Sequence, residues 1–107
     1  MTPTEFVACV AKEKDALLAS YLGDESGAAV AKKIEGLRLT TAQREKMKEI
    51  LDTALTDAFY TVLLALDGAA SLGGKQRRFQ LRDEDGTVLS GDLEGPAWEQ
   101  FHGKPAK

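Results

Sequence analysis

Residues 40–66 read TTAQREKMKEILDTALTDAFYTVLLAL and form the longest helical pattern in the chain. Apolar side chains recur in this stretch every three or four residues, as they do along one face of an α-helix. Thr40 and Gln43 have the types and spacing of a capping box, and Gly68 follows where a left-handed glycine commonly ends a helix. We therefore predict one long central helix, against which every other segment must build its share of the core.

The last turns of this helix differ from the rest. Between Ala58 and Leu66 apolar residues occupy every side, which predicts that protein surrounds this end completely. Asp67 follows at the negative end of the helix dipole, where a carboxylate is unfavourable. Its side chain either bonds to the loop that follows or is simply solvated, and we favour the solvated side chain as the simpler interpretation.

Two shorter helices are predicted before the central one. Thr2, Pro3 and Glu5 are typical of a capped helix start, and this first helix should run to about Leu22. A second, shorter helix should end near Glu35. Too short to be stable alone in water, it needs the first and third helices as packing partners.

A β-hairpin is predicted after the central helix, over residues 77–91. Apolar and polar side chains alternate there, and residues 83–86 have the Asp and Gly positions of a type I turn. With a left-handed glycine in that turn, Arg82 lies opposite Val88. A tighter turn at residues 85–86 stays possible but would mix the two faces.

Gly95 and Pro96 predict the start of a short final helix, on which Trp98 and Phe101 lie about one turn apart. The predicted fold class is therefore α+β: a three-helix layer with a long central helix, followed by a β-hairpin and a short C-terminal helix. We expect a single domain over residues 1–103 and a frayed C-terminal tail over residues 104–107.

The composition is that of a globular protein, with 43% hydrophobic and 29% charged residues in a chain of 107. The net charge of −3 argues against partners such as nucleic acid or an anionic membrane surface, both of which favour a basic protein face. Cys9 is the only cysteine, so an internal disulfide is excluded. The sequence starts without the basic and apolar regions of a signal peptide, so we expect a cytoplasmic protein.

No pattern in the sequence indicates catalysis. A Ser/His/Asp order, a metal-spaced His/Cys set and a dinucleotide glycine fingerprint are all missing. The glycine-rich stretch 68–75 approaches a phosphate-binding loop, but Gly74 stands where that loop needs its lysine. The acidic turn at residues 83–85 lacks the ligand spacing of a calcium loop. We therefore expect no enzyme, no cofactor and no metal site.

Protein binding is the better hypothesis. The outer strand of a hairpin offers unpaired backbone groups to a partner, and the chain separates its basic and acidic residues into opposite poles. The sequence leaves open whether the hairpin or the acidic face of the central helix is the binding surface. The candidate interaction surface comprises seven residues: Arg77, Arg78, Gln80, Arg82, Asp52, Asp57 and Trp98.

We therefore expect a small soluble protein-interaction module that binds another protein, and a homodimer is possible. Its size and acidity resemble those of small neutralising partners such as bacterial immunity proteins and antitoxins, and a regulatory partner fits equally well. The alternative is a small-molecule sensor with Tyr60 or Arg78 as its polar group. Its pocket would lie between the central helix and the hairpin, lined by Phe59, Leu63, Phe79, Leu81 and Trp98.

Overall fold

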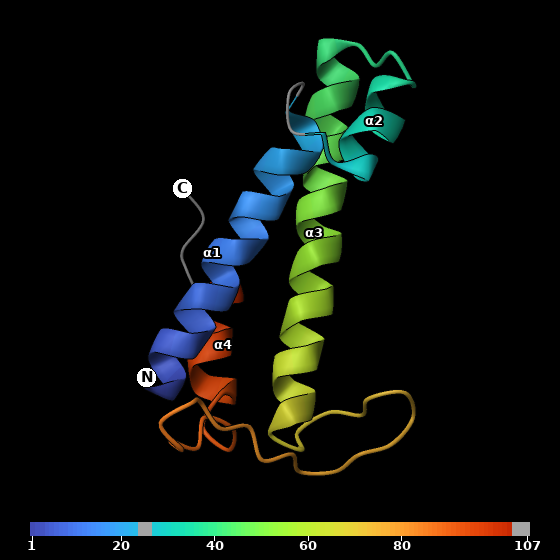
Figure 1. Cartoon of the computed structure of the whole chain (residues 1–107). Coiled ribbons are helices and arrows are strands. Elements are labelled where there is room, and N and C mark those ends of the chain that lie inside the picture. Colours follow the sequence, from blue (N-terminus) through green and yellow to red (C-terminus); the bar gives the residue numbers. More distant parts are fainter. Residues whose placement is uncertain (24–26, 104–107) are drawn as a thin grey trace.

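The computed structural model describes residues 1–23 and 27–103, and within these ranges the regular structure is four helices. They are α1 (Pro3–Leu22), α2 (Ala29–Glu35), α3 (Thr41–Leu66) and α4 (Glu94–Phe101). The molecule is elongated, with extents of 46 × 30 × 29 Å, because α1 and α3 run side by side along its length (Figure 1). The predicted frayed tail at residues 104–107 lies outside the described residues.

The predicted starts of the two long helices are confirmed. Thr2 accepts a hydrogen bond from the Glu5 N–H, and the Glu5 side chain accepts one from the Thr2 N–H, which completes a capping box. Thr40 and Gln43 form the same reciprocal pair at the start of α3. Each pair satisfies backbone donors that the first helical turn leaves free.

The core lies where the start of α1, the end of α3 and α4 meet. It is built on four buried residues: Val7, Leu63, Leu93 and Ala97. Helix α1 packs against the other three helices, and α3 also packs against α4. The prediction that the end of α3 is covered on every side is wrong. Leu63 and Ala65 are buried, but Val62 is 45% exposed because no helix of the described chain covers that side.

The predicted β-hairpin does not form, and the α+β fold class is therefore wrong. Residues 67–93 cross the end of the helices as a loop, and the described residues contain no strand (Figure 1). The turn itself is present: the Gly86 N–H donates to the Asp83 carbonyl, and Gly86 has a φ of +83°. Arg82 and Val88 form one isolated antiparallel bridge.

Strand pairing stops after this bridge because the next backbone groups bond elsewhere. The Phe79 N–H donates to the Leu66 carbonyl at the end of α3. The Ser90 hydroxyl accepts from the Leu81 N–H and donates to the Phe79 carbonyl, so a side chain stands where the facing backbone would be. An isolated two-stranded hairpin is marginal in water, and here bonds to the helix end and to a serine replace the ladder.

Candidate functional site

The loop begins at Gly68, where both the backbone conformation and a close approach of the returning chain require glycine. Gly68 has a φ of +78°, its N–H donates to the Ala65 carbonyl, and the Ala69 N–H donates to the Leu64 carbonyl. This is the Schellman arrangement, and it confirms the predicted left-handed glycine. A Cβ at Gly68 would also lie 2.7 Å from Cγ of Arg78, so glycine is needed here both for the turn and for the returning chain.

Asp67 is the residue that holds the far end of the loop in place. Its Oδ1 accepts a hydrogen bond from the Gly91 N–H at 2.6 Å. Its Oδ2 accepts from the N–H groups of Leu93 and Glu94 at 2.8 and 2.9 Å. The interpretation of Asp67 as a solvated side chain is therefore wrong. One carboxylate joins the end of α3 to the start of α4 across more than twenty residues of sequence.

These bonds also explain how α4 begins. The helix starts at Glu94 rather than at Gly95 or Pro96, and its N-cap residue Leu93 has no side-chain oxygen to offer. Asp67 supplies the missing acceptor from a different helix, where a carboxylate is also favoured by the positive end of the α4 dipole. The unfavourable position of Asp67 at the end of α3 is thus balanced by a favourable one at the start of α4.

The acidic turn of the loop is held by local bonds. Asp83 Oδ1 accepts from the N–H groups of Asp85 and Thr87, and Oδ2 lies 3.1 Å from the amino group of Met1. The bond from the Thr87 N–H, with those from the Met1 amine and the Asp85 N–H, holds the pKa of Asp83 below its ordinary value. The Asp83 bond conversely raises the pKa of the Met1 amine. The turn therefore lies next to Met1, just before α1, and its Asp83 carboxylate is already bonded within the molecule.

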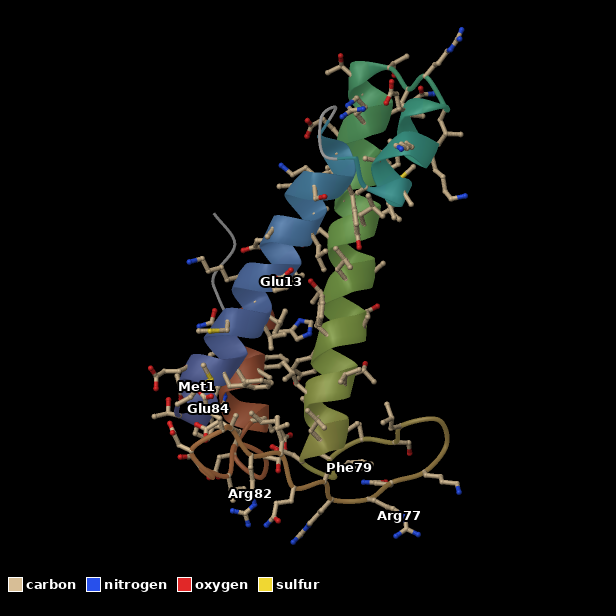
Figure 2. The ribbon with its side chains drawn as sticks, viewed as in Figure 1. Met1, Glu13, Arg77, Phe79, Arg82 and Glu84 are labelled. Atoms are coloured by element: carbon tan, nitrogen blue, oxygen red, sulfur yellow. The ribbon has the colours of Figure 1, made fainter. Side chains whose placement is uncertain are left out.

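The opposite part of the loop is basic. Residues 68–82 contain four cations and no acidic residue, whereas residues 83–103 contain six acidic residues and no Lys or Arg. We name the exposed side chains Lys75, Arg77, Arg78, Arg82 and Phe79 the basic loop face. No ion pair to any of its cations is found in residues 1–23 or 27–103. Arg77 and Arg82 point away from the helices, while Glu84 lies toward Met1 (Figure 2).

The predicted interaction residues separate into three places. Arg77, Arg78, Gln80 and Arg82 all lie on the loop, where Arg78 and Gln80 line one pocket and Arg82 Nε donates to Gln80 Oε1. Asp52 lies at the middle of α3, where its Oδ1 is 2.6 Å from Nζ of Lys14 on α1. It is therefore paired within the molecule.

The other two predicted residues also lie off the loop. Asp57 is exposed on α3 and lines a groove there. Trp98 is 54% exposed on α4 and belongs to an aromatic cluster, with its ring 6.5 Å from that of Tyr60 and 5.3 Å from that of His102. Tyr60 and His102 meet edge to face at 4.5 Å, so the imidazole packs against an aromatic ring.

The pocket of the sensor hypothesis is only partly present. A pocket of about 430 Å³ lies between the end of α3 and the loop, and Arg78 and Phe79 line it as predicted. The other lining residues are Leu66, Asp67, Gln80, Val88, Ser90 and Gly91. Leu63 is instead buried in the core, and Trp98 takes part in the aromatic cluster on α4.

No protein family, curated protein or solved structure matches this chain. In the described part of the chain, no three His, Cys, Asp or Glu side chains are grouped so that they could hold a metal ion. None of the helices, over those same residues, has the length and apolar character needed to cross a membrane.

Proposed function

We propose that this chain is a protein-interaction module that docks its basic loop face onto an acidic patch of another protein. The observation that carries the proposal is the basic loop face itself: four cations without an anionic partner in the described residues, on a loop that Asp67 fastens to two helices. A loop that is already held in place loses less conformational freedom on binding. A surface of this kind suits a small neutralising or regulatory partner.

The basic loop face also offers an apolar contact. Phe79, between Arg78 and Gln80, is 40% exposed, and Leu72 and Val88 on the same loop are 45% and 40% exposed. Aromatic and arginine side chains are the residues that most often dominate the binding energy of protein interfaces. Phe79 with the neighbouring arginines supplies both types within one short stretch.

A folded protein fits this surface better than a nucleic acid does. The acidic residues that follow the cations in the same loop, including Glu84 and Asp92, would repel a chain of phosphates that extended beyond the basic loop face. A protein partner can instead present both signs of charge and match the basic and the acidic part of the loop together. Such complementarity speeds association and fixes the orientation of the complex.

The test compares two variants that change the net charge equally. The loop variant replaces three cations of the basic loop face by glutamine: Lys75, Arg77 and Arg78. The control variant makes the same replacement at three exposed lysines of α1 and α2: Lys12, Lys32 and Lys33. Affinity capture from the native host identifies the bound protein, and calorimetric titration then measures the dissociation constant for each chain.

We expect the loop variant to bind about 3- to 150-fold more weakly, since three exposed ion pairs of about 0.2–1 kcal/mol each are lost. The control variant should bind as tightly as the unaltered chain, and added salt should weaken the binding of these two chains more than that of the loop variant. Equal affinity of the two variants would show that the surface is not this loop. Recovery of an oligonucleotide as the tight binder would replace the protein partner altogether.

A further inference from the structure

The middle of α3 exposes a second surface, distinct from the basic loop face. Below α2 in Figure 1, α3 has α1 and α4 on one side and no helix on the other. A groove of about 460 Å³ lies on this outer face. Its lining residues come from three turns of the one helix: Lys46, Glu49, Ile50, Thr53, Ala54 and Asp57. Ile50 is 56% exposed, the second largest value among the large apolar side chains of the described residues.

The two ends of this groove differ in charge, with a Lys–Glu pair at one end and a carboxylate at the other. Lys46 is at the end near the start of α3, and among the described residues its ion pair is with Glu49 of its own turn, at 2.8 Å. Asp57 is at the other end, roughly 16 Å along the axis at 1.5 Å per residue, and its side chain is exposed. The apolar floor between them combines a large residue, Ile50, with a small one, Ala54. The groove therefore has the Lys46–Glu49 pair at one end, an exposed carboxylate at the other, and a large apolar side chain beside a small one.

A second copy of this chain in antiparallel orientation can bring Lys46 to the exposed Asp57 carboxylate and Ile50 to the small side chains of the groove. We infer that two copies associate through α3, with a two-fold axis that crosses the helices between Leu51 and Asp52. This register places Lys46 of each copy beside Asp57 of the other, and each Ile50 over Thr53 and Ala54 of its partner. The seam positions 46, 50, 53 and 57 alternate in steps of four and three, which is the spacing of packed helices.

The association is weak and depends on concentration. A contact between two single helices buries less surface than the about 1,200–2,000 Å² that stable complexes bury. It uses a face that the basic loop face does not touch, so the dimer and the proposed docking of a partner can succeed or fail independently. The dimer would present two basic loop faces, one at each end.

Charge reversal at the two ends of the groove tests the pairing. Lys46→Asp places Asp beside Asp57 at both ends of the dimer, and Asp57→Lys places two lysines together. Each variant alone should be monomeric in sedimentation velocity up to about 1 mM, where the unaltered chain dimerises. Mixed in equal amounts, the two variants should form a heterodimer, because every end then joins an Asp to a Lys.

Three results complete the test. The double variant that carries both changes should dimerise with a dissociation constant within about threefold of the unaltered chain, because both pairs are restored in reverse. Lys12→Asp on α1 changes the charge equally and should leave the dimer intact. Because the substituted side chains are exposed, circular dichroism should show that the helices of each variant stay folded. A chain that is monomeric throughout, or single variants that dimerise as well alone as when mixed, would overturn the inference.

Discussion

Replacement of Asp67 by alanine is the most informative perturbation of the fold. The change removes three hydrogen bonds to one carboxylate, at 2.6, 2.8 and 2.9 Å, and leaves the N–H groups of Gly91, Leu93 and Glu94 without this acceptor. A hydrogen bond to a charged group contributes about 1.5–3 kcal/mol, and loss of a helix N-cap costs about 0.5–2 kcal/mol. Removal of a carboxylate from the end of α3 returns about 0.3–1 kcal/mol.

The balance is a loss of about 2–4 kcal/mol in the free energy of unfolding, since bonds to one carboxylate do not add fully. For a chain of this length that loss lowers the melting temperature by about 10–20 °C. Urea denaturation followed by circular dichroism measures the free energy, and Asp92→Ala is the matched control. Asp92 is an exposed carboxylate of the same loop, and its replacement should change stability by less than about 0.5 kcal/mol.

Two further results would refine or refute this reasoning. Asp67→Asn keeps one carbonyl oxygen, which can serve either Gly91 or the start of α4, so its loss should fall between those of the alanine variant and the control. The amide proton signals of Leu93 and Glu94 should move in both variants. If Asp67→Ala is no less stable than Asp92→Ala, the carboxylate does not hold the loop.

The remaining predictions concern the loop and the core. Gly73→Ala should cost about 1 kcal/mol in stability, because its backbone is left-handed but the space around the new Cβ is open. Gly68→Ala should cost about 2–3 kcal/mol, because its Cβ would also meet the returning chain at Arg78. Thermal denaturation of the two variants measures the difference. Because the pKa of Asp83 is lowered on folding, its contribution to the turn is complete above its unfolded pKa of about 3.9 and is lost as pH falls through the lower folded value; the amide shift of Thr87 should titrate with that lower midpoint in NMR spectra. Leu93→Ala, at a fully buried position, should cost about 2–5 kcal/mol in urea denaturation.

The helices could be predicted from the sequence because their signals are local. Thr2 with Glu5, and Thr40 with Gln43, are three residues apart, and each pair closes within its own turn. Gly68 ends α3 through bonds to the same helix. A pattern that is satisfied by its neighbours in sequence is visible without the fold.

The hairpin was predicted wrongly because its local signals were real but insufficient. The turn at residues 83–86 and the opposition of Arg82 and Val88 are both present. The alternating pattern could not reveal two competing sets of hydrogen bonds. The Phe79 N–H donates to the Leu66 carbonyl, and the Ser90 hydroxyl bonds to the Leu81 N–H and the Phe79 carbonyl. Those competitors come from outside the local pattern, and they decide whether strands form.

Asp67 shows what long-range bonding hides from the sequence. Its signal was the unfavourable carboxylate at a helix end, and nothing local indicates that the start of another helix lies within reach. The same limit applied to the candidate surface. The four loop residues, which lie within six positions of one another in sequence, are on the same loop, whereas Asp52 is paired with Lys14 and Asp57 belongs to a different face.

The central claim is that residues 67–93 form an ordered loop fastened by Asp67, without paired strands. Amide hydrogen exchange of the unaltered chain tests it directly, because exchange reports which N–H groups are bonded. We predict slow exchange at Gly91, Leu93 and Glu94, with fast exchange at Arg77 and Arg78. Fast exchange at the three Asp67 partners, or slow exchange at Arg77 and Arg78, would contradict the account.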